Sequence, residues 1–141
     1  MTHSILDMGI DVYEVIFMKE TILIIDDNQV NQQVFLEALG HAWNILVSKG
    51  IDEAFALINQ GGINLIVLDV LFEGGTAFDF IAHLSEIEDG LDIPVVYVTS
   101  MEERHEMHKA MKLGGSDYIF KPLDIQEIQM TIRNQMKLQA L

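Results

Sequence analysis

Carboxylate, hydroxyl and amine side chains stand directly after the apolar runs of this chain. Asp26 and Asp27 end one run, and Asp69 ends another. A third run ends at Thr99, and a fourth short element is followed by Lys121. Crowded carboxylates raise one another's pKa unless a cation lies between them, and Mg²⁺ is the cation that prefers hard oxygens and bridges to phosphoryl groups. A metal, an amine and a hydroxyl around one free carboxylate describe a site that forms an acyl phosphate on Asp69.

Any one of these acids alone is better explained as a helix cap or a solvated loop residue. The agreement of four separate runs is what favours a common site. The run over residues 64–70 contains four consecutive large aliphatic residues without alternation, which indicates a strand covered on both faces. Open α/β sheets bind ligands at the carboxyl ends of their strands, so we expect the three acids, the hydroxyl and the amine to meet at one edge.

The remaining pattern predicts helices between these strands. Strands are expected at residues 21–27, 43–47, 64–70, 94–100 and 118–120. Helices are expected from an Asn28 cap to Gly40, from Asp52 to Gly61, after a Thr76 cap, over 102–113 and from Asp124 onward. Their expected buried faces include Val30, Val34 and Ala38; Ala54, Leu57 and Ile58; Phe80, Ile81, Leu84 and Ile87; Met107, Ala110 and Met111; and Ile125, Ile128 and Ile132. Alternating strands and helices predict a parallel sheet with right-handed crossovers in a doubly wound α/β fold.

Composition limits the function. The 141 residues make one domain of ordinary size. A net charge of −14 with only 8 Lys and Arg disfavours direct binding to nucleic acid. The chain has no cysteine, so disulfides and thiolate metal sites are excluded. No apolar run is long enough for a membrane span, and the first 17 residues lack Lys and Arg, so we expect a cytoplasmic protein without a membrane anchor.

Residues 1–18 have no clean apolar period and are predicted to be an N-terminal extension that can be flexible, before a domain that spans residues 19–141. Met18 is followed by Lys19 and Glu20 directly before the first strand, which is typical of a natural start. The alternative is an additional element that covers a sheet edge or a partner chain.

In order and spacing, the chemical residues resemble those of the receiver domains of two-component response regulators, over about residues 19–138. The acidic pair Asp26 and Asp27, the phosphoacceptor-like Asp69, the hydroxyl of Thr99 and Lys121 carry the resemblance. Two further matches are Pro122, directly after the lysine, and Tyr118, three residues before it. The resemblance implies a flavodoxin-like fold with strand order 2-1-3-4-5.

The resemblance also implies roles. Asp26, Asp27, Asp69 and the backbone carbonyl of Leu71 would hold Mg²⁺. Lys121 would pair with the phosphoryl group, and Thr99 and Tyr118 would report its presence as switch residues. The Lys121–Pro122 bond would be cis, an isomer that is accessible mainly before proline. The implied partners are a sensor histidine kinase or a phosphotransfer protein, and the implied domain is not an enzyme beyond assisting its own phosphorylation and slow dephosphorylation.

One segment departs from the family pattern. Four residues after Asp69 the family usually has proline, whereas this chain has Glu73, and Thr76 and Ala77 stand where Asp-Gly is common. Glu73 is either a solvated loop acid or an additional carboxylate near the metal. His105 and His108 at helical spacing are either a metal pair or part of a solvated face.

Three functions compete at this point. The first is a phosphorelay switch that changes the surface of helix four, strand five and helix five. The second is a degenerate receiver that serves as a docking or dimerisation module without phosphorylation, so a homodimer is possible. The third is a phosphatase with an aspartyl nucleophile on the first strand, but such enzymes need an acid where this chain has Asn28.

The output is left open by the sequence. No basic or domain-sized segment follows the last helix, so we expect either docking on a downstream protein or a receiver that belongs to a longer chain with a fused output domain. Leu71 and Met101, each two residues after a site residue, are expected to flank the path of water to an acyl phosphate. Both are apolar, which predicts slow hydrolysis.

Overall fold

A parallel sheet forms the centre of the protein. The computed structural model describes residues 19–72 and 75–139. The five parallel strands are β1 (Thr21–Ile25), β2 (Asn44–Ser48), β3 (Leu65–Asp69), β6 (Val95–Thr99) and β7 (Asp117–Phe120). They lie in the order β2-β1-β3-β6-β7, with all neighbours parallel. This is the order 2-1-3-4-5 of the main strands, which confirms the predicted doubly wound fold.

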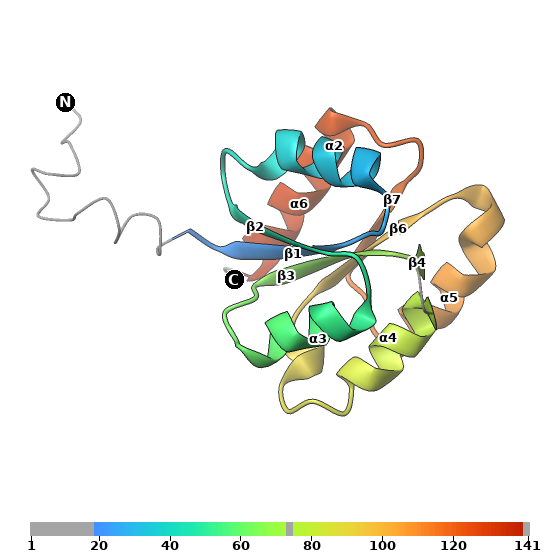
Figure 1. The fold of residues 1–141 in the computed structure, drawn as a ribbon. Coiled ribbons are helices and arrows are strands. Elements are labelled where there is room, and N and C mark those ends of the chain that lie inside the picture. Colours follow the sequence, from blue (N-terminus) through green and yellow to red (C-terminus); the bar gives the residue numbers. More distant parts are fainter. Residues whose placement is uncertain (1–18, 73–74, 140–141) are drawn as a thin grey trace, which may run out of the picture.

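Helices cover both faces of the sheet (Figure 1). Helices α2 (Gln29–Leu39) and α6 (Ile125–Gln139) lie on one face. Helices α3 (Ile51–Asn59), α4 (Ala77–Leu84) and α5 (Arg104–Leu113) lie on the other. Two short 3₁₀ helices, η1 (Gly90–Asp92) and η2 (Met101–Glu103), precede β6 and α5.

The core is divided by the sheet into two apolar clusters. Along β1, Ile22 and Ile24 contribute to the cluster under α2 and α6, whereas Leu23 and Ile25 contribute to the cluster under α3, α4 and α5. Successive side chains of a strand point to opposite faces, which explains this alternation. Every residue of β3 and β6 is buried, as predicted for strands covered on both sides.

Side-chain caps fix where three helices begin, and all three were predicted. The Asn28 side chain accepts a hydrogen bond from the Asn31 amide at 2.9 Å. Thr76 and Asp79 form a reciprocal capping box at the start of α4. Asp124 accepts from an amide in the first turn of α6. Each cap satisfies an amide that has no partner within its own helix.

Parts of the predicted buried faces were wrong. Val30 is 72% exposed and Ile125 is 39% exposed, although both belong to the expected apolar stripes. In α2 the buried stripe runs instead through Phe35, Ala38 and Leu39. The apolar residues of this helix cover more than one face, so their spacing alone does not select the stripe that packs. Ile87 packs against the core from beyond the end of α4 rather than from within the helix.

The segment after β3 is also different from the predicted loop over residues 72–75. It contains two short antiparallel strands, β4 (Leu71–Phe72) and β5 (Gly75–Thr76), at the carboxyl end of the sheet (Figure 1). The Ala77 amide then donates to the Val70 carbonyl at 2.8 Å. Pairing across only two residues is too short to produce an apolar period, so the sequence pattern could not show it.

Two further expectations concern the ends and membranes. Residues 1–18 lie outside the described residues, so the expectation of an N-terminal extension is untested. Across residues 19–72 and 75–139, no helix has both the length and the apolar character needed to cross a membrane.

Candidate functional site

Four of the predicted site residues lie at the carboxyl end of the sheet. Asp69 is the last residue of β3 and Thr99 the last of β6, while Asp26 follows β1 and Lys121 follows β7. Asp26, Asp69 and Thr99 are 1%, 4% and 0% exposed, respectively. Parallel pairing in register brings these strand ends to the same edge. Buried polar groups at this edge are therefore a direct result of the topology.

Asp69 and Lys121 form an ion pair across this edge. The Lys121 Nζ lies 3.1 Å from Oδ1 and 3.2 Å from Oδ2 of Asp69. The Leu71 amide donates a third hydrogen bond to Oδ1 at 3.2 Å. Burial raises the pKa of the Asp69 carboxyl to about 6, opposed by the Lys121 ammonium and reinforced by the negative charge of Asp26. Lys121 and the Leu71 amide thus offset only part of the cost of burying the Asp69 negative charge.

Asp26 is held by the start of α2. Its Oδ1 accepts from the Asn28 amide at 2.9 Å, and its Oδ2 accepts from the Asn31 side chain at 3.2 Å. Burial raises its pKa, these two hydrogen bonds and the Lys121 charge oppose the rise, and the negative charge of Asp27 adds to it. Asp27 itself is exposed. The acidic pair therefore consists of one buried, oriented carboxylate and one at the surface.

The donor set fits Mg²⁺. Within the described residues, no group of three or more His, Asp or Glu side chains is close enough to bind a metal on its own. Mg²⁺ does not require one, because it commonly takes one or two carboxylates and retains several waters. Burial raises the pKa of both Asp26 and Asp69, and the charge of a neighbouring aspartate adds to each rise. A divalent cation would stabilise the charged form of both carboxylates. The residues that would hold the ion are Asp26, Asp27 and Asp69, with the Leu71 carbonyl as a further oxygen ligand.

The two expected switch residues lie in different surroundings. The buried Thr99 hydroxyl donates to the Ser100 carbonyl at 3.1 Å. Tyr118 is 41% exposed on the edge strand β7, and its ring contacts Phe120 edge to face at a centroid distance of 4.9 Å. The structure therefore brings Asp26, Asp69, Lys121 and Thr99 to one edge, whereas Tyr118 lies on the outer surface of the sheet edge.

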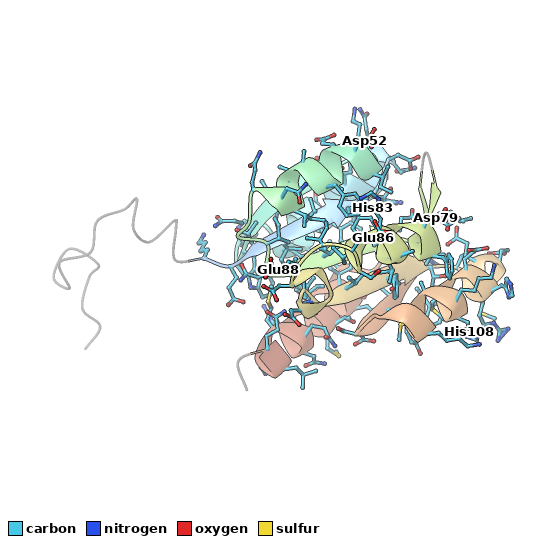
Figure 2. The ribbon with its side chains drawn as sticks, turned by 90° about the horizontal axis from the view of Figure 1, so that it is seen from below. Asp52, Asp79, His83, Glu86, Glu88 and His108 are labelled. Atoms are coloured by element: carbon cyan, nitrogen blue, oxygen red, sulfur yellow. The ribbon has the colours of Figure 1, made fainter. Side chains whose placement is uncertain are left out.

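Other expectations can be placed as well. The Lys121–Pro122 peptide bond is cis, as the resemblance implies. Glu73 lies outside the described residues. His105 and His108 are exposed on α5, and Figure 2 shows His108 on the outer side of that helix. His83 is on α4, with its ring 4.2 Å from the ring of Phe55 on α3 (Figure 2).

Sequence reasoning missed one residue of this site, Glu103. Its Oε1 lies 3.5 Å from the Lys121 Nζ, and its side chain is only 15% exposed. Burial lowers the pKa of Lys121, but the Asp69 and Glu103 carboxylates together outweigh this effect and the pKa rises. The available signal was the capping-box spacing from Ser100 to Glu103, which directs the glutamate back toward the end of β6.

Comparison with known proteins agrees with this geometry. A sequence profile described as "Response regulator receiver domain" matches residues 22–133. The phosphate regulon transcriptional regulatory protein PhoB of Escherichia coli (strain K12) is 28% identical over 121 residues, covering 85% of this chain and 53% of PhoB. A probable cyclic di-GMP phosphodiesterase of Vibrio cholerae is 24% identical, covering 83% of this chain and 26% of that protein. The chain therefore spans about half, or less, of these curated relatives.

Solved structures show the same fold. The chemotaxis response regulator CheY4 of Vibrio cholerae matches with a TM-score of 0.74 at 17% identity, over 83% of this chain and 98% of that one. A two-component response regulator from Clostridium difficile matches with a TM-score of 0.75 at 24% identity, over 84% and 97% of the two chains.

The fold and the site define a signalling receiver rather than a classical enzyme. This chain belongs to the response regulator receiver domain family of two-component signalling.

Proposed function

We propose that the domain, residues 19–141, is a phosphorelay switch in which Asp69 accepts a phosphoryl group from a histidine kinase or a phosphotransfer protein. The observation that carries the proposal is the buried Asp69 carboxylate, paired with Lys121 at 3.1 Å and close to the charge of Asp26. Few structural reasons exist to bury a carboxylate whose pKa is raised by its surroundings, and perturbed groups of this kind are typical of functional sites.

The transfer is a substitution at phosphorus. An Asp69 carboxylate oxygen forms the new P–O bond as the P–N bond of a phosphohistidine breaks, and the bond pair leaves with the imidazole nitrogen. Mg²⁺, when bound, supplies charge neutralisation for the carboxylates and the transferring group. Lys121 pairs with the phosphoryl oxygens through its ammonium, which already lies within hydrogen-bond distance of both Asp69 oxygens.

The readout begins at Thr99. Its hydroxyl donates to the Ser100 carbonyl, and a new anionic acceptor on Asp69 offers a stronger, charge-assisted partner. Reorientation of Thr99 alters the connection between β6 and α5, and Tyr118 on the neighbouring strand responds to the space this opens. The surface formed by α5, β7 and α6 is then the part of the domain that differs between the two states.

Partners follow from this chemistry. A kinase or phosphotransfer histidine supplies the phosphoryl group, and a downstream protein or a fused output domain reads it. Relatives named as a transcriptional regulator and a probable phosphodiesterase carry additional sequence beyond the matched part, which supports a fused output without specifying it. The switch acts in the cytoplasm, without direct contact to nucleic acid.

A second candidate function is a receiver that docks or dimerises without phosphorylation. The observation that favours it is the β4–β5 pairing in the segment where the chain departs from the usual family sequence. Exposed apolar side chains near the same edge, Leu71 at 45% and Met101 at 63%, would suit a docking surface.

Intact-mass measurement after incubation with Mg²⁺ and acetyl phosphate separates the two. The switch predicts one added phosphoryl group in the wild type and none in Asp69→Asn, with Glu37→Gln, an exposed acid on α2, as the matched control. An unmodified wild type, or equal modification of Asp69→Asn, would reject Asp69 as the acceptor and leave the docking function.

A further inference from the structure

Lys121 is shared between two carboxylates that come from different elements. Its Nζ contacts both oxygens of Asp69 at the end of β3 and also lies 3.5 Å from Oε1 of Glu103 at the end of η2. The Lys121 and Glu103 side chains are 27% and 15% exposed, so solvent screens this pair only in part. In the proposed function the Lys121 ammonium pairs with the phosphoryl group. Before phosphorylation, this ammonium already contacts two carboxylates, Asp69 and Glu103.

Glu103 is also attached to the strand end that carries Thr99. Its Oε2 accepts a hydrogen bond from the Ser100 amide at 3.1 Å. The Ser100 carbonyl accepts in turn from the Thr99 hydroxyl, also at 3.1 Å. One carboxylate thus connects the Ser100 backbone, at the start of η2, with the Lys121 ammonium and through it with Asp69.

We propose that Glu103 is a positioning residue that restrains the unphosphorylated state, because its carboxylate competes with the phosphoryl group for Lys121. This inference rests on the proposed phosphorylation of Asp69 and assigns a regulatory element to that site. An ammonium has three N–H donors, and the contacts to Asp69 and Glu103 occupy all three. A phosphoryl oxygen can gain a Lys121 donor only if one of these contacts is given up.

Charge determines which contact is lost. A phosphoryl group on Asp69 brings close to two negative charges to the site. Glu103, which contacts the same ammonium, is repelled by this anion, whereas the Asp69 oxygens are covalently part of it. Release of Glu103 from Lys121 frees its carboxylate and weakens its hold on the Ser100 amide. The connection between Ser100 and α5 is thereby loosened.

A purely structural role for Glu103 makes different predictions. As a helix cap, Glu103 needs only an acceptor for the Ser100 amide, and glutamine supplies that acceptor equally well. As a competitor for Lys121 it needs its negative charge, which glutamine lacks. Glu103→Gln therefore removes the proposed function and retains the cap, whereas Glu103→Ala removes both.

The test compares the wild type, Glu103→Gln, Glu103→Ala and Glu106→Gln in the full chain. Glu106→Gln removes one negative charge from α5, three residues further along, and serves as the control. Phosphorylation by acetyl phosphate with Mg²⁺ is followed by intact mass, and thermal stability is measured without phosphodonor. Binding of the beryllium trifluoride anion, a tetrahedral phosphoryl analogue, is measured by calorimetry so that affinity is read without a chemical step.

We expect Glu103→Gln and Glu103→Ala to be phosphorylated about three- to tenfold faster than the wild type and to bind beryllium trifluoride more tightly by a similar factor, because one nearby negative charge has been removed. Glu106→Gln should match the wild type in both assays. Only Glu103→Ala should lose thermal stability, because only it loses the cap.

The outcomes separate the two proposals. If the wild type gains a phosphoryl group but Glu103→Gln reacts and binds no better than Glu106→Gln, the restraint is disproved while phosphorylation of Asp69 stands. Slower reaction or weaker analogue binding in Glu103→Gln would also overturn it, since Glu103 would then assist the site. A wild type that gains no phosphoryl group and does not bind the analogue overturns both.

Discussion

The Lys121 ammonium lies almost equally far from the two Asp69 oxygens, at 3.1 and 3.2 Å, and so joins the ends of two strands that are not neighbours in the sheet. Even with this partner, burial raises the pKa of Asp69 to about 6. The ion pair therefore offsets only part of the free-energy cost of burying the charged carboxylate. The remaining cost should be measurable as a loss of stability.

Asp69→Asn should stabilise the metal-free fold near neutral pH. A carboxyl whose folded pKa is raised binds its proton more tightly in the folded chain than in the unfolded chain. The ionised Asp69 carboxylate therefore lowers the free energy of unfolding. This loss is absent below about pH 4 and grows as the pH rises through about 6. A shift from 3.8 to about 6 corresponds to about 3 kcal/mol at pH 7.5. Urea unfolding in the presence of a chelator measures the difference.

The gain in Asp69→Asn should be smaller at pH 5 than at pH 7.5, because part of the wild type is then protonated. Lys121 remains partly paired through Glu103 in the variant. Glu37→Gln on α2 is the control and should show no comparable gain. Equal gains at both pH values would contradict a raised pKa for Asp69.

Mg²⁺ should bind the unphosphorylated domain and raise its melting temperature by mass action, following RT ln(1 + [L]/Kd). Asp27→Ala should abolish the shift, because Asp27 is the exposed member of the acidic pair and is available to the ion without structural change. The measurement is a thermal melt over a series of Mg²⁺ concentrations. Glu37→Ala should retain the shift; an undiminished shift in Asp27→Ala would place the ion elsewhere.

The acyl phosphate should be long-lived. Leu71 and Met101 are exposed and apolar, so neither can hydrogen-bond a water that attacks the phosphoryl group. Each 1.4 kcal/mol of lost positioning slows hydrolysis about tenfold, which predicts a lifetime on the order of tens of minutes or more without a phosphatase. Decay is followed by intact mass in the wild type and in Leu71→Asn/Met101→Glu. Decay of the wild type within seconds, or no acceleration in the double variant, would refute the role of these side chains.

Gly115→Ala should destabilise the domain far more than Gly61→Ala. Both glycines have positive φ, at +155° and +81°, so both substitutions carry a backbone penalty of about 1 kcal/mol. A Cβ on Gly115 would overlap Cε2 of the fully buried Tyr97, whereas a Cβ on Gly61 meets nothing within 4 Å. We expect an additional loss of about 1–3 kcal/mol at Gly115 from overpacking. Similar urea midpoints for the two variants would contradict this contact.

The sequence was sufficient for the parts of the molecule that depend on local pattern. Strand β3 was predictable because four consecutive aliphatic residues precede Asp69. In the structure all five residues of the strand are buried. The caps at Asn28, Thr76 and Asp124 were predictable because a cap is a local interaction with its own first turn. The parallel, doubly wound architecture then followed from the alternation of strands and helices, whereas the strand order came from the family resemblance.

Other features depend on tertiary packing and could not be predicted. Val30 was placed in the core because its spacing suits a helix face, but the sheet selects the face that carries Phe35 and Leu39. Glu103 meets Lys121 only after β6 and β7 pair, so its contact has no signal in the chain beyond the spacing to Ser100. The site residues were proposed from type and order, and their metal and phosphoryl chemistry stays a prediction until the experiments above are done.

The division of the core by the sheet determines how the domain can respond to a signal. Helix α5 contributes Met107 and Ala110 to the cluster it shares with α3 and α4, and none of its described side chains belongs to the cluster under α2 and α6. A displacement of α5 therefore disturbs side chains on one face of the sheet only. The packing of α6 against the opposite face can stay unchanged, so that α6 borders the altered surface without leaving its place and a rearrangement on one side does not require the whole fold to loosen.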